Sequence, residues 1–315
     1  MPYALDRFRG IFPAALTMFD KENRLDEEAT ARHWDWLIAN QQADGLVIAG
    51  TSGEFIAMDM EERRRIFRLA PSVARHRVPV IFGSGHYSTK LTIQLSQEAQ
   101  KCGADGLIII LPYYQRPPKV AVIEHYREIR KAVDLPLMLY NNPQNSACPE
   151  LTPFEIAQLV EEDVLHMVKS TVGSVEPIHD LEFLVGDRMA IFYGSFLAAF
   201  EGLCAGADGW ISGILNVATK AAKALYKAVG EENDARKGLR IWKRMLPLVH
   251  LVAHRPLGPV SDLATYRSIL NLWGLEGGYC RAPFFPLDST QEAELRRLLT
   301  SSGWIDPDHV LAEVS

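Results

Sequence analysis

Several features that mark membrane, secreted and nucleic-acid-binding proteins are missing from this sequence. No apolar stretch approaches the roughly 18 residues that a membrane span requires, and the N-terminus does not resemble a signal peptide. There is no polybasic run, and the 315 residues carry a formal net charge of -6, which gives no electrostatic footprint for nucleic acid. We therefore expect a cytoplasmic protein that binds neither membranes nor nucleic acids.

Cysteine is scarce as well. The four cysteines are widely spaced and form no CxxC pair: Cys102, Cys148, Cys204 and Cys280. We expect them to be reduced and mostly buried, as small hydrophobic residues. Hydrophobic residues make up 48% of the chain and charged residues 23%, which is ample for a large core. The composition is that of an enzyme-sized globular chain.

The sequence also lacks the glycine-rich phosphate loop that a doubly wound open sheet usually carries after its first strand. Short apolar runs recur instead, mostly without polar alternation, as expected for parallel strands buried on both faces. The runs are Ile11–Thr17, Asp44–Gly50, Val78–Gly83, Asp105–Leu111, Leu135–Asn141, Val164–Ser170, Met189–Gly194 and Ala207–Gly213. Alternation of these runs with helix-period segments predicts an α/β protein of the (β/α)8 TIM barrel class.

The helix-period segments continue beyond the last predicted strand. They include Asp26–Gln41, Asp59–Arg77, Thr89–Cys102, Lys119–Ala132 and Thr152–Glu161, and later Ala218–Val229, Ala235–Ala253, Asp262–Leu272 and Thr290–Thr300. The later segments are more than one barrel helix requires. Because no linker composition precedes them, we expect a barrel over residues 1–225 and a C-terminal helical extension over residues 226–315, packed on the barrel as one domain.

An internal repeat supports the barrel. Ala-Asp-Gly followed by an apolar run occurs three times, starting at Ala43, Ala104 and Ala207. Gly103 and Gly206 precede two of the copies, and such a glycine can end a helix in a left-handed conformation. We expect the three copies to open the second, fourth and eighth strands.

The working residues of a barrel lie at the carboxyl ends of its strands. Lys169 is the only lysine in any predicted strand. An ammonium group in an apolar barrel is costly unless it is paired or neutralised, and a neutral amine is the form that attacks a ketone carbonyl. Lys169 is therefore the candidate nucleophile for a Schiff base.

Two other strand ends offer polar groups. Tyr140 ends an apolar strand, so its ring can pack while its hydroxyl faces the barrel mouth and transfers protons. The turn Gly50–Glu54 supplies adjacent hydroxyls and backbone N–H groups, which could clamp a carboxylate. Taken alone, Tyr140 could equally be a core tyrosine, and the turn Gly50–Glu54 could be an ordinary loop. The functional interpretation depends on their occurring together with Lys169.

Together these residues form a known pattern. From about Gly10 to Leu287 the chain resembles the dihydrodipicolinate synthase / N-acetylneuraminate lyase family of Schiff-base class I aldolases. The matching segments are Gly10–Ala14 with Thr17, Gly50–Glu54, Leu111–Tyr114, Tyr140–Pro143, Lys169, Gly194 and Gly206–Ser212. This combination is specific to the family, but it does not identify the substrate.

The resemblance implies roles for the matching positions. Lys169 would form the Schiff base, and Tyr140 would relay protons with help from the Thr51 hydroxyl. Thr51 and Ser52 would hold the carboxylate of a small 2-oxo acid through their amides and hydroxyls. The resemblance implies no metal and no other cofactor.

The remaining matches concern the pocket wall and the assembly. Gly194 and Ile211 would line the 2-oxo acid pocket through their backbones. Tyr114 would enter the active site of a neighbouring subunit, which implies a homotetramer built as a dimer of dimers. Tyr114 would thus be the fourth catalytic residue that the resemblance implies, beside Lys169, Tyr140 and Thr51.

The sequence departs from both main branches of the family. The synthase branch has an arginine five residues after the catalytic tyrosine, where it binds the second substrate's carboxylate. Here that position is Asn145, and an amide cannot form the bidentate pair that arginine gives. The sialic acid lyase branch has acidic residues after the strand-seven glycine, whereas this chain has Ser195–Leu197. We therefore expect neither of these two activities.

The leading expectation is a lyase that cleaves or forms an aldol, or that dehydrates a 2-keto-3-deoxy sugar acid. One alternative is a deaminase of a cyclic imino acid such as pyrroline-4-hydroxy-2-carboxylate. Another is metal-dependent aldol chemistry, for which only His86 and His166 lie in or directly after a predicted strand. A third is a non-catalytic regulatory barrel, although a barrel needs neither Lys169 nor Tyr140 to fold.

Overall fold

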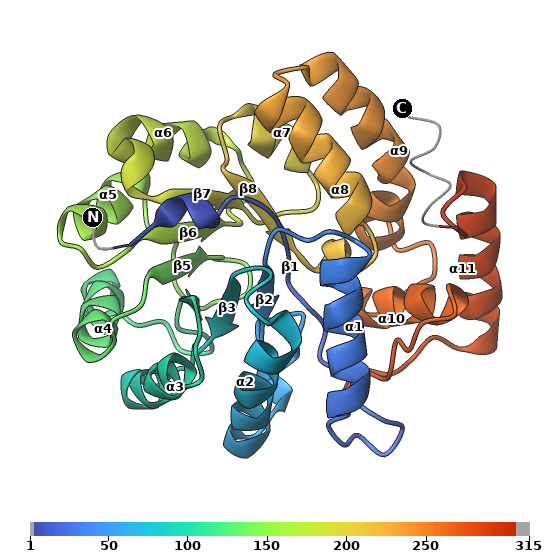
Figure 1. The fold of residues 1–315 in the computed structure, drawn as a ribbon, viewed down its shortest axis with the longest axis horizontal. Coiled ribbons are helices and arrows are strands. Elements are labelled where there is room, and N and C mark those ends of the chain that lie inside the picture. The colour runs from blue at the N-terminus through green and yellow to red at the C-terminus, as the bar shows by residue number, and fades with distance from the viewer. Residues whose placement is uncertain (1–2, 307–315) are drawn as a thin grey trace.

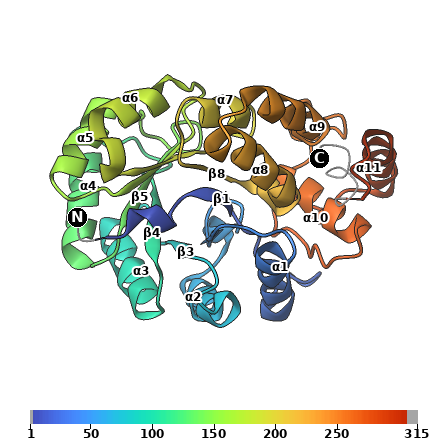
Figure 2. The same ribbon diagram turned by 45° about the horizontal axis from the view of Figure 1, so that its top comes forward.

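The computed structural model describes residues 3–306, in which eight parallel strands close into a barrel (Figure 1, Figure 2). The strands are β1 (Gly10–Pro13), β2 (Leu46–Ile48), β3 (Val80–Gly83), β4 (Gly106–Ile110), β5 (Leu137–Asn141), β6 (Met167–Ser170), β7 (Ala190–Tyr193) and β8 (Gly209–Ser212). The sheet has the order β1-β8-β7-β6-β5-β4-β3-β2, and a parallel bridge between Ala14 and Val47 joins its two ends. The predicted TIM barrel is confirmed, and each strand is shorter than its apolar run.

Helices form the outer layer of the barrel. They are α1 (Glu27–Ala39), α2 (Met60–Ala74), α3 (Thr89–Lys101), α4 (Lys119–Ala132), α5 (Pro153–Glu161), α6 (Glu176–Val185), α7 (Ala199–Cys204) and α8 (Thr219–Tyr226). The sequence encodes several helix starts directly. Asp59 and Thr152 begin α2 and α5 with complete capping boxes, in which each side chain accepts an N–H three residues on. The helix-period segment expected from Thr152 to Glu161 therefore forms a helix with Thr152 as its cap.

The barrel has two apolar cores, one on each side of its wall. Inward-facing residues such as Phe12, Ile81 and Met167 fill the inside of the barrel. Their neighbours in the chain, such as Ile11 and Val168, pack outward against the helices. This division follows from the period of two along a strand, because successive side chains point to opposite faces. It decides which polar residues of a strand can reach the barrel mouth.

The repeated Ala-Asp-Gly segment fixes how the strands start. Asp44, Asp105 and Asp208 stand just before β2, β4 and β8, as predicted. Each exchanges two bonds with one residue of an adjacent strand: the carboxylate accepts that residue's N–H at 2.7–2.8 Å, and the aspartate N–H donates to its carbonyl. The partners lie in β1, β3 and β7. Gly103 and Gly206 have positive φ angles of 84° and 101°, which confirms the left-handed helix ends.

Three more helices follow the barrel: α9 (Ala235–Ala253), α10 (Asp262–Leu272) and α11 (Ser289–Ser302). They lie beside α1 and α8 on one side of the molecule (Figure 1, Figure 2). Their buried side chains, such as Trp242 and Leu295, belong to the same apolar cluster as Trp210 of β8. Residues 1–2 and 307–315 of the expected barrel and extension lie outside the described residues. None of the described helices is long and apolar enough to cross a membrane.

Candidate functional site

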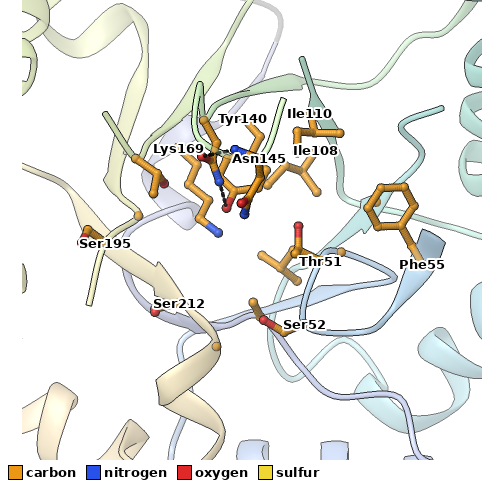
Figure 3. Close-up of a pocket in the computed structure, with 18 of the residues that line it drawn as sticks. Thr51, Ser52, Phe55, Ile108, Ile110, Tyr140, Asn145, Lys169, Ser195 and Ser212 are labelled. Carbon is orange, nitrogen blue, oxygen red and sulfur yellow. Dashed lines mark hydrogen bonds between the residues drawn. The ribbon is translucent and has the colours of Figure 1, made fainter. Parts of the chain in front are cut away.

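The carboxyl ends of the strands surround a cavity of about 260 Å³ (Figure 3). Predicted site residues that line it are Thr51, Ser52, Tyr140, Asn145, Lys169 and Gly194. They come from the segments that follow β2, β5 and β7 and from strands β5 and β6 themselves. The fold thus brings together positions that are spread over more than 140 residues of sequence (194 minus 51 is 143).

Strand register makes Lys169 and Tyr140 neighbours. Tyr140 of β5 pairs with Lys169 of β6, and both side chains face the inside of the barrel. The Lys169 Nζ lies 4.0 Å from the centroid of the Tyr140 ring. Lys169 is only 5% exposed, and it has no ion-pair partner among the residues that the structure describes. The ammonium group is thus buried against an aromatic face and not against a carboxylate.

A short chain of hydrogen bonds orients the Tyr140 hydroxyl (Figure 3). Its oxygen accepts a bond of 2.8 Å from the side-chain amide of Asn142, whose own oxygen accepts the N–H of Asn145. Because the Tyr140 oxygen is the acceptor, its proton remains available for donation into the cavity. Asn142 lies in the matching segment Tyr140–Pro143, but the resemblance implied no role for it.

The turn that carries Thr51 and Ser52 is held in an uncommon conformation. Ala49 and Glu54, which flank it, both lie in the left-handed region, with φ of 49° and 56°. The Glu54 N–H donates back to the Thr51 carbonyl at 3.0 Å. Among residues 3–306, no acceptor faces the N–H groups of Thr51 or Ser52. Two free amides next to two hydroxyls are groups that could hold a carboxylate.

A buried ion pair ties this turn to the C-terminal extension. Glu54 and Arg267 of α10 are 3% and 2% exposed, and the Arg267 Nη2 donates to the Glu54 Oε1 at 2.6 Å. The second Glu54 oxygen accepts the backbone N–H of Arg281 at 2.8 Å. Arg267 also donates to the carbonyls of Thr17 and Gly277, each at 2.8 Å. The pair therefore joins the end of β1, the turn after β2 and the segment after α10.

Gly194 is required by the close approach of Lys169. A β-carbon at this position would lie 1.9 Å from the Thr171 Oγ1 and 3.0 Å from the Lys169 Cε. Any larger residue would push the lysine side chain or Thr171 out of place. The backbone N–H of Gly194 donates to the Ser170 carbonyl at 2.7 Å, so it supports the end of β6.

Two predicted residues lie away from the cavity. Ile211 is fully buried and packs inside the barrel, while the next residues, Ser212 and Gly213, line the cavity. Tyr114 is 95% exposed and has a φ of 79°, so its side chain stands out from the loop after β4. Neither of the two residues contributes to the cavity within this chain.

Of the other lining residues, Thr171 and Asp262 had no place in the sequence prediction, and Ser195 appeared there only as a departure from the sialic acid lyase pattern. Thr171 lies two positions after Lys169 and shares its face of the strand, and Ser195 follows Gly194. Asp262, the first residue of α10, comes from the extension, and desolvation raises the pKa of its carboxyl. Among the described residues that line the cavity, Lys169 and Asp262 are the only ones with charged side chains.

A second buried arginine supports the cavity wall. Arg63 of α2 donates to the carbonyls of Gly83 and Gly85, at 2.6 and 3.1 Å, and its guanidinium lies over the Phe55 ring. Burial without a facing carboxylate lowers the pKa of Arg63 to about 10. Gly83, Gly85 and Phe55 all line the cavity, so Arg63 shapes it from outside.

The two histidines considered as metal ligands have local hydrogen bonds. The Nδ1 of His86 accepts the Ser88 N–H at 3.0 Å, and the Nδ1 of His166 accepts the Leu137 N–H at 3.3 Å. Burial lowers the pKa of both rings. Residues 3–306 contain no group of three or more His, Cys, Asp and Glu side chains placed to hold a metal ion.

The pair of Glu54 and Arg267 leads to a stability prediction. Arg267→Met should lower the free energy of unfolding by about 3–5 kcal/mol, because it leaves the Glu54 carboxylate buried without its partner. Adding Glu54→Gln in the same chain should recover part of that loss. Urea denaturation followed by circular dichroism measures both. Arg24→Met, which breaks an ion pair whose arginine is 73% exposed, is the control and should have little effect. If Arg267→Met lowers the free energy of unfolding no more than the control does, the pair does not stabilise the fold in the way predicted.

Solved structures resemble this barrel over nearly its whole length. A prophage protein from E. coli K12, described as belonging to the dihydrodipicolinic acid synthase family and in complex with pyruvate, is 30% identical with a TM-score of 0.85. That match covers 94% of this chain and 99% of the other. A chloride-inhibited dihydrodipicolinate synthase from Acinetobacter baumannii, complexed with pyruvate, is also 30% identical, with a TM-score of 0.84 and coverage of 94% and 99%.

Sequence comparison leads to the same group of proteins. A 4-hydroxy-tetrahydrodipicolinate synthase from Pelobacter propionicus is 32% identical over 300 residues, which span 95% of this chain and 100% of the relative. The family model for the Dihydrodipicolinate synthetase family matches residues 7–302. The chain therefore belongs to the dihydrodipicolinate synthetase family and is a lyase of that family.

Proposed function

We propose that this lyase forms a Schiff base between Lys169 and a small 2-oxo acid. The observation that carries the proposal is the burial of the Lys169 ammonium without a carboxylate partner, 4.0 Å from the Tyr140 ring, in the cavity that also contains Thr51 and Ser52. A buried amine, a proton-transfer group and a carboxylate clamp are the parts that this chemistry needs.

The geometry supports the following steps. The amides and hydroxyls of Thr51 and Ser52 hold the substrate carboxylate, which places the neighbouring carbonyl carbon toward Lys169. The neutral amine attacks that carbon, and the carbinolamine loses water to give an iminium ion. Tyr140 donates and accepts the protons of these steps through its cavity-facing hydroxyl. The iminium then takes up the electron pair of a broken bond, and an enamine results.

The leaving group decides which reaction follows. We propose aldol cleavage or condensation, or dehydration of a 2-keto-3-deoxy sugar acid. A deaminase of a cyclic imino acid would use the same iminium and remains the alternative. The cavity of about 260 Å³ suits a substrate of a few carbon atoms beyond the 2-oxo acid, which fits all three reactions.

We further propose that the enzyme is neither a true dihydrodipicolinate synthase nor a sialic acid lyase. The cavity wall has Asn145 where a synthase would have its carboxylate-binding arginine. Arg116, the first candidate to replace it, is exposed and donates to the Ala147 carbonyl. The wall after Gly194 is Ser195, Phe196 and Leu197, without the acidic groups that would bind a polyhydroxylated sugar.

The nucleophile can be tested by trapping. Incubation with pyruvate and borohydride should add one covalent group to the parent protein, and Lys169→Ala should show neither the adduct nor turnover, because the reacting amine is gone. Intact mass and peptide mapping locate the adduct. Lys131→Ala, at a position with a 66% exposed side chain, is the matched control and should be trapped like the parent. No adduct on the parent would point to a non-catalytic barrel, and an adduct on another lysine would refute the assignment.

The departure at Asn145 can be tested with the synthase substrates. Pyruvate and aspartate semialdehyde should give no useful condensation, because none of the described residues that line the cavity is an arginine that could bind the second carboxylate. The coupled assay for dihydrodipicolinate measures this, with an authentic synthase as the positive control. Rapid turnover by this protein would mean that another cation, with Arg116 the first to examine, takes the place of the arginine.

We also propose that the site is completed in a homotetramer, a dimer of dimers, by Tyr114 of a neighbouring subunit. Two observations support this assembly. Tyr114 is 95% exposed in a strained left-handed conformation, which is costly for a bulky residue unless something else fixes it. A second cavity of about 580 Å³ opens next to Thr51 and Asn145, and Phe55, Tyr113 and Phe284 give it an apolar wall. An aromatic side chain from a partner would fit there.

Tyr114→Phe tests this assembly. It should lower kcat by about tenfold or more, because a proton-relay hydroxyl is lost, and it should leave the oligomer intact. Tyr114→Trp should loosen the dimer through a clash. Activity and sedimentation velocity over a dilution series measure both effects. Tyr279→Phe, at an exposed tyrosine that lines neither of the two cavities, is the control. A fully active monomer would rule out a shared site.

A further inference from the structure

Asp262 reaches the catalytic cavity from outside the barrel. It is the first residue of α10, and the Ser261 hydroxyl fixes this helix start by accepting the Leu263 N–H at 3.2 Å. The residue as a whole is exposed, although the protein around its carboxyl raises the pKa of that group by desolvation, and it lines both the catalytic cavity and the larger cavity beside it. The two cavities also share Thr51, Ser52 and Asn145 as lining residues. Asp262 therefore lies where the two cavities meet.

The charges of the cavity wall are unevenly distributed. Lys169 and Asp262 are the only charged side chains among the described residues that line it. In the proposed reaction the Lys169 nitrogen becomes part of the substrate as an iminium, and the substrate's own carboxylate balances its charge. The negative charge of Asp262 then dominates the electrostatic potential at the mouth of the catalytic cavity, where the far end of the substrate would lie.

The other polar groups near the mouth are neutral. Gln144 and Asn145 offer side-chain amides and Ser195 offers a hydroxyl, while Phe196 and Leu197 are apolar. A substrate hydroxyl can donate to Asp262 and also bond to the amides. Among the described residues that line the cavity, Lys169 is the only cation, and the first carboxylate of the substrate already balances its charge. A second substrate carboxylate would therefore face Asp262 uncompensated, and like-charge repulsion would reject such a ligand.

We infer that Asp262 is a specificity-determining residue, which selects substrates whose far end carries a neutral hydroxyl over substrates that end in a second carboxylate. The inference rests on the proposed function and adds the class of the second reactant. The residue comes from the C-terminal extension, so this extension, besides holding the Thr51–Ser52 turn, contributes to substrate choice.

A matched pair of aldehydes tests the inference. Succinate semialdehyde and 4-hydroxybutanal have the same chain length and differ only in a terminal carboxylate or hydroxymethyl group. Each is condensed with pyruvate, and the ratio of the two kcat/KM values is measured for the parent, Asp262→Asn and Asp262→Glu. Glu28→Gln is the control for net charge, because Glu28 also lies in a first helical turn but has an 89% exposed side chain outside the cavity.

The parent should prefer the neutral aldehyde by at least about tenfold, and Asp262→Asn should remove most of that preference, as expected for one charge interaction at a partly hydrated site. Asp262→Glu and Glu28→Gln should keep it. An unchanged ratio in Asp262→Asn would overturn the inference. So would a parent that prefers the carboxylate, or one that is trapped by pyruvate and condenses neither aldehyde. Failure of the parent to form the pyruvate adduct would instead refute the proposed function itself.

Discussion

The buried ion pair between Glu54 and Arg267 is the interaction on which the site's geometry depends. Two charged groups have been withdrawn from water, which is costly, so the pair persists only because every neighbouring element supplies the matching partners. These partners are the carbonyls of Thr17 and Gly277 and the N–H of Arg281. The left-handed backbone at Glu54 is held by the same contacts. The turn with Thr51 and Ser52 therefore presents its amides in a fixed position before any substrate arrives.

The sequence predicted the barrel and its central pair of residues because both follow from short-range rules. Parallel strands that are buried on both faces appear as apolar runs, so all eight strands could be located from the pattern of apolar residues along the chain. A lone lysine at the end of such a run has few structural explanations. Once the strands are aligned in order, the register of β5 and β6 places Tyr140 beside Lys169 without further information.

What the sequence did not reveal depends on contacts between distant segments. Asp262 and Arg267 lie more than 90 residues beyond Lys169 in the chain (262 minus 169 is 93), and no periodicity marks either as part of a site. Asn142 lies in a matching segment, but its hydrogen bond to the Tyr140 hydroxyl becomes visible only in the folded chain. Ile211 shows the opposite case: it was expected to line the pocket through its backbone, its side chain packs inside the barrel, and the next residues, Ser212 and Gly213, line the cavity.

The aspartates that open β2, β4 and β8 give this architecture a practical property. Their reciprocal bonds with β1, β3 and β7 fix the strands at the end opposite the cavity. The wall of the cavity is built from other segments, so its composition can be altered without disturbing the pairing of the strands. The chain is therefore suited to loop grafting. A transplanted segment after β7, exchanged together with the start of α10, could redirect the enzyme to new aldehydes while the scaffold keeps its stability.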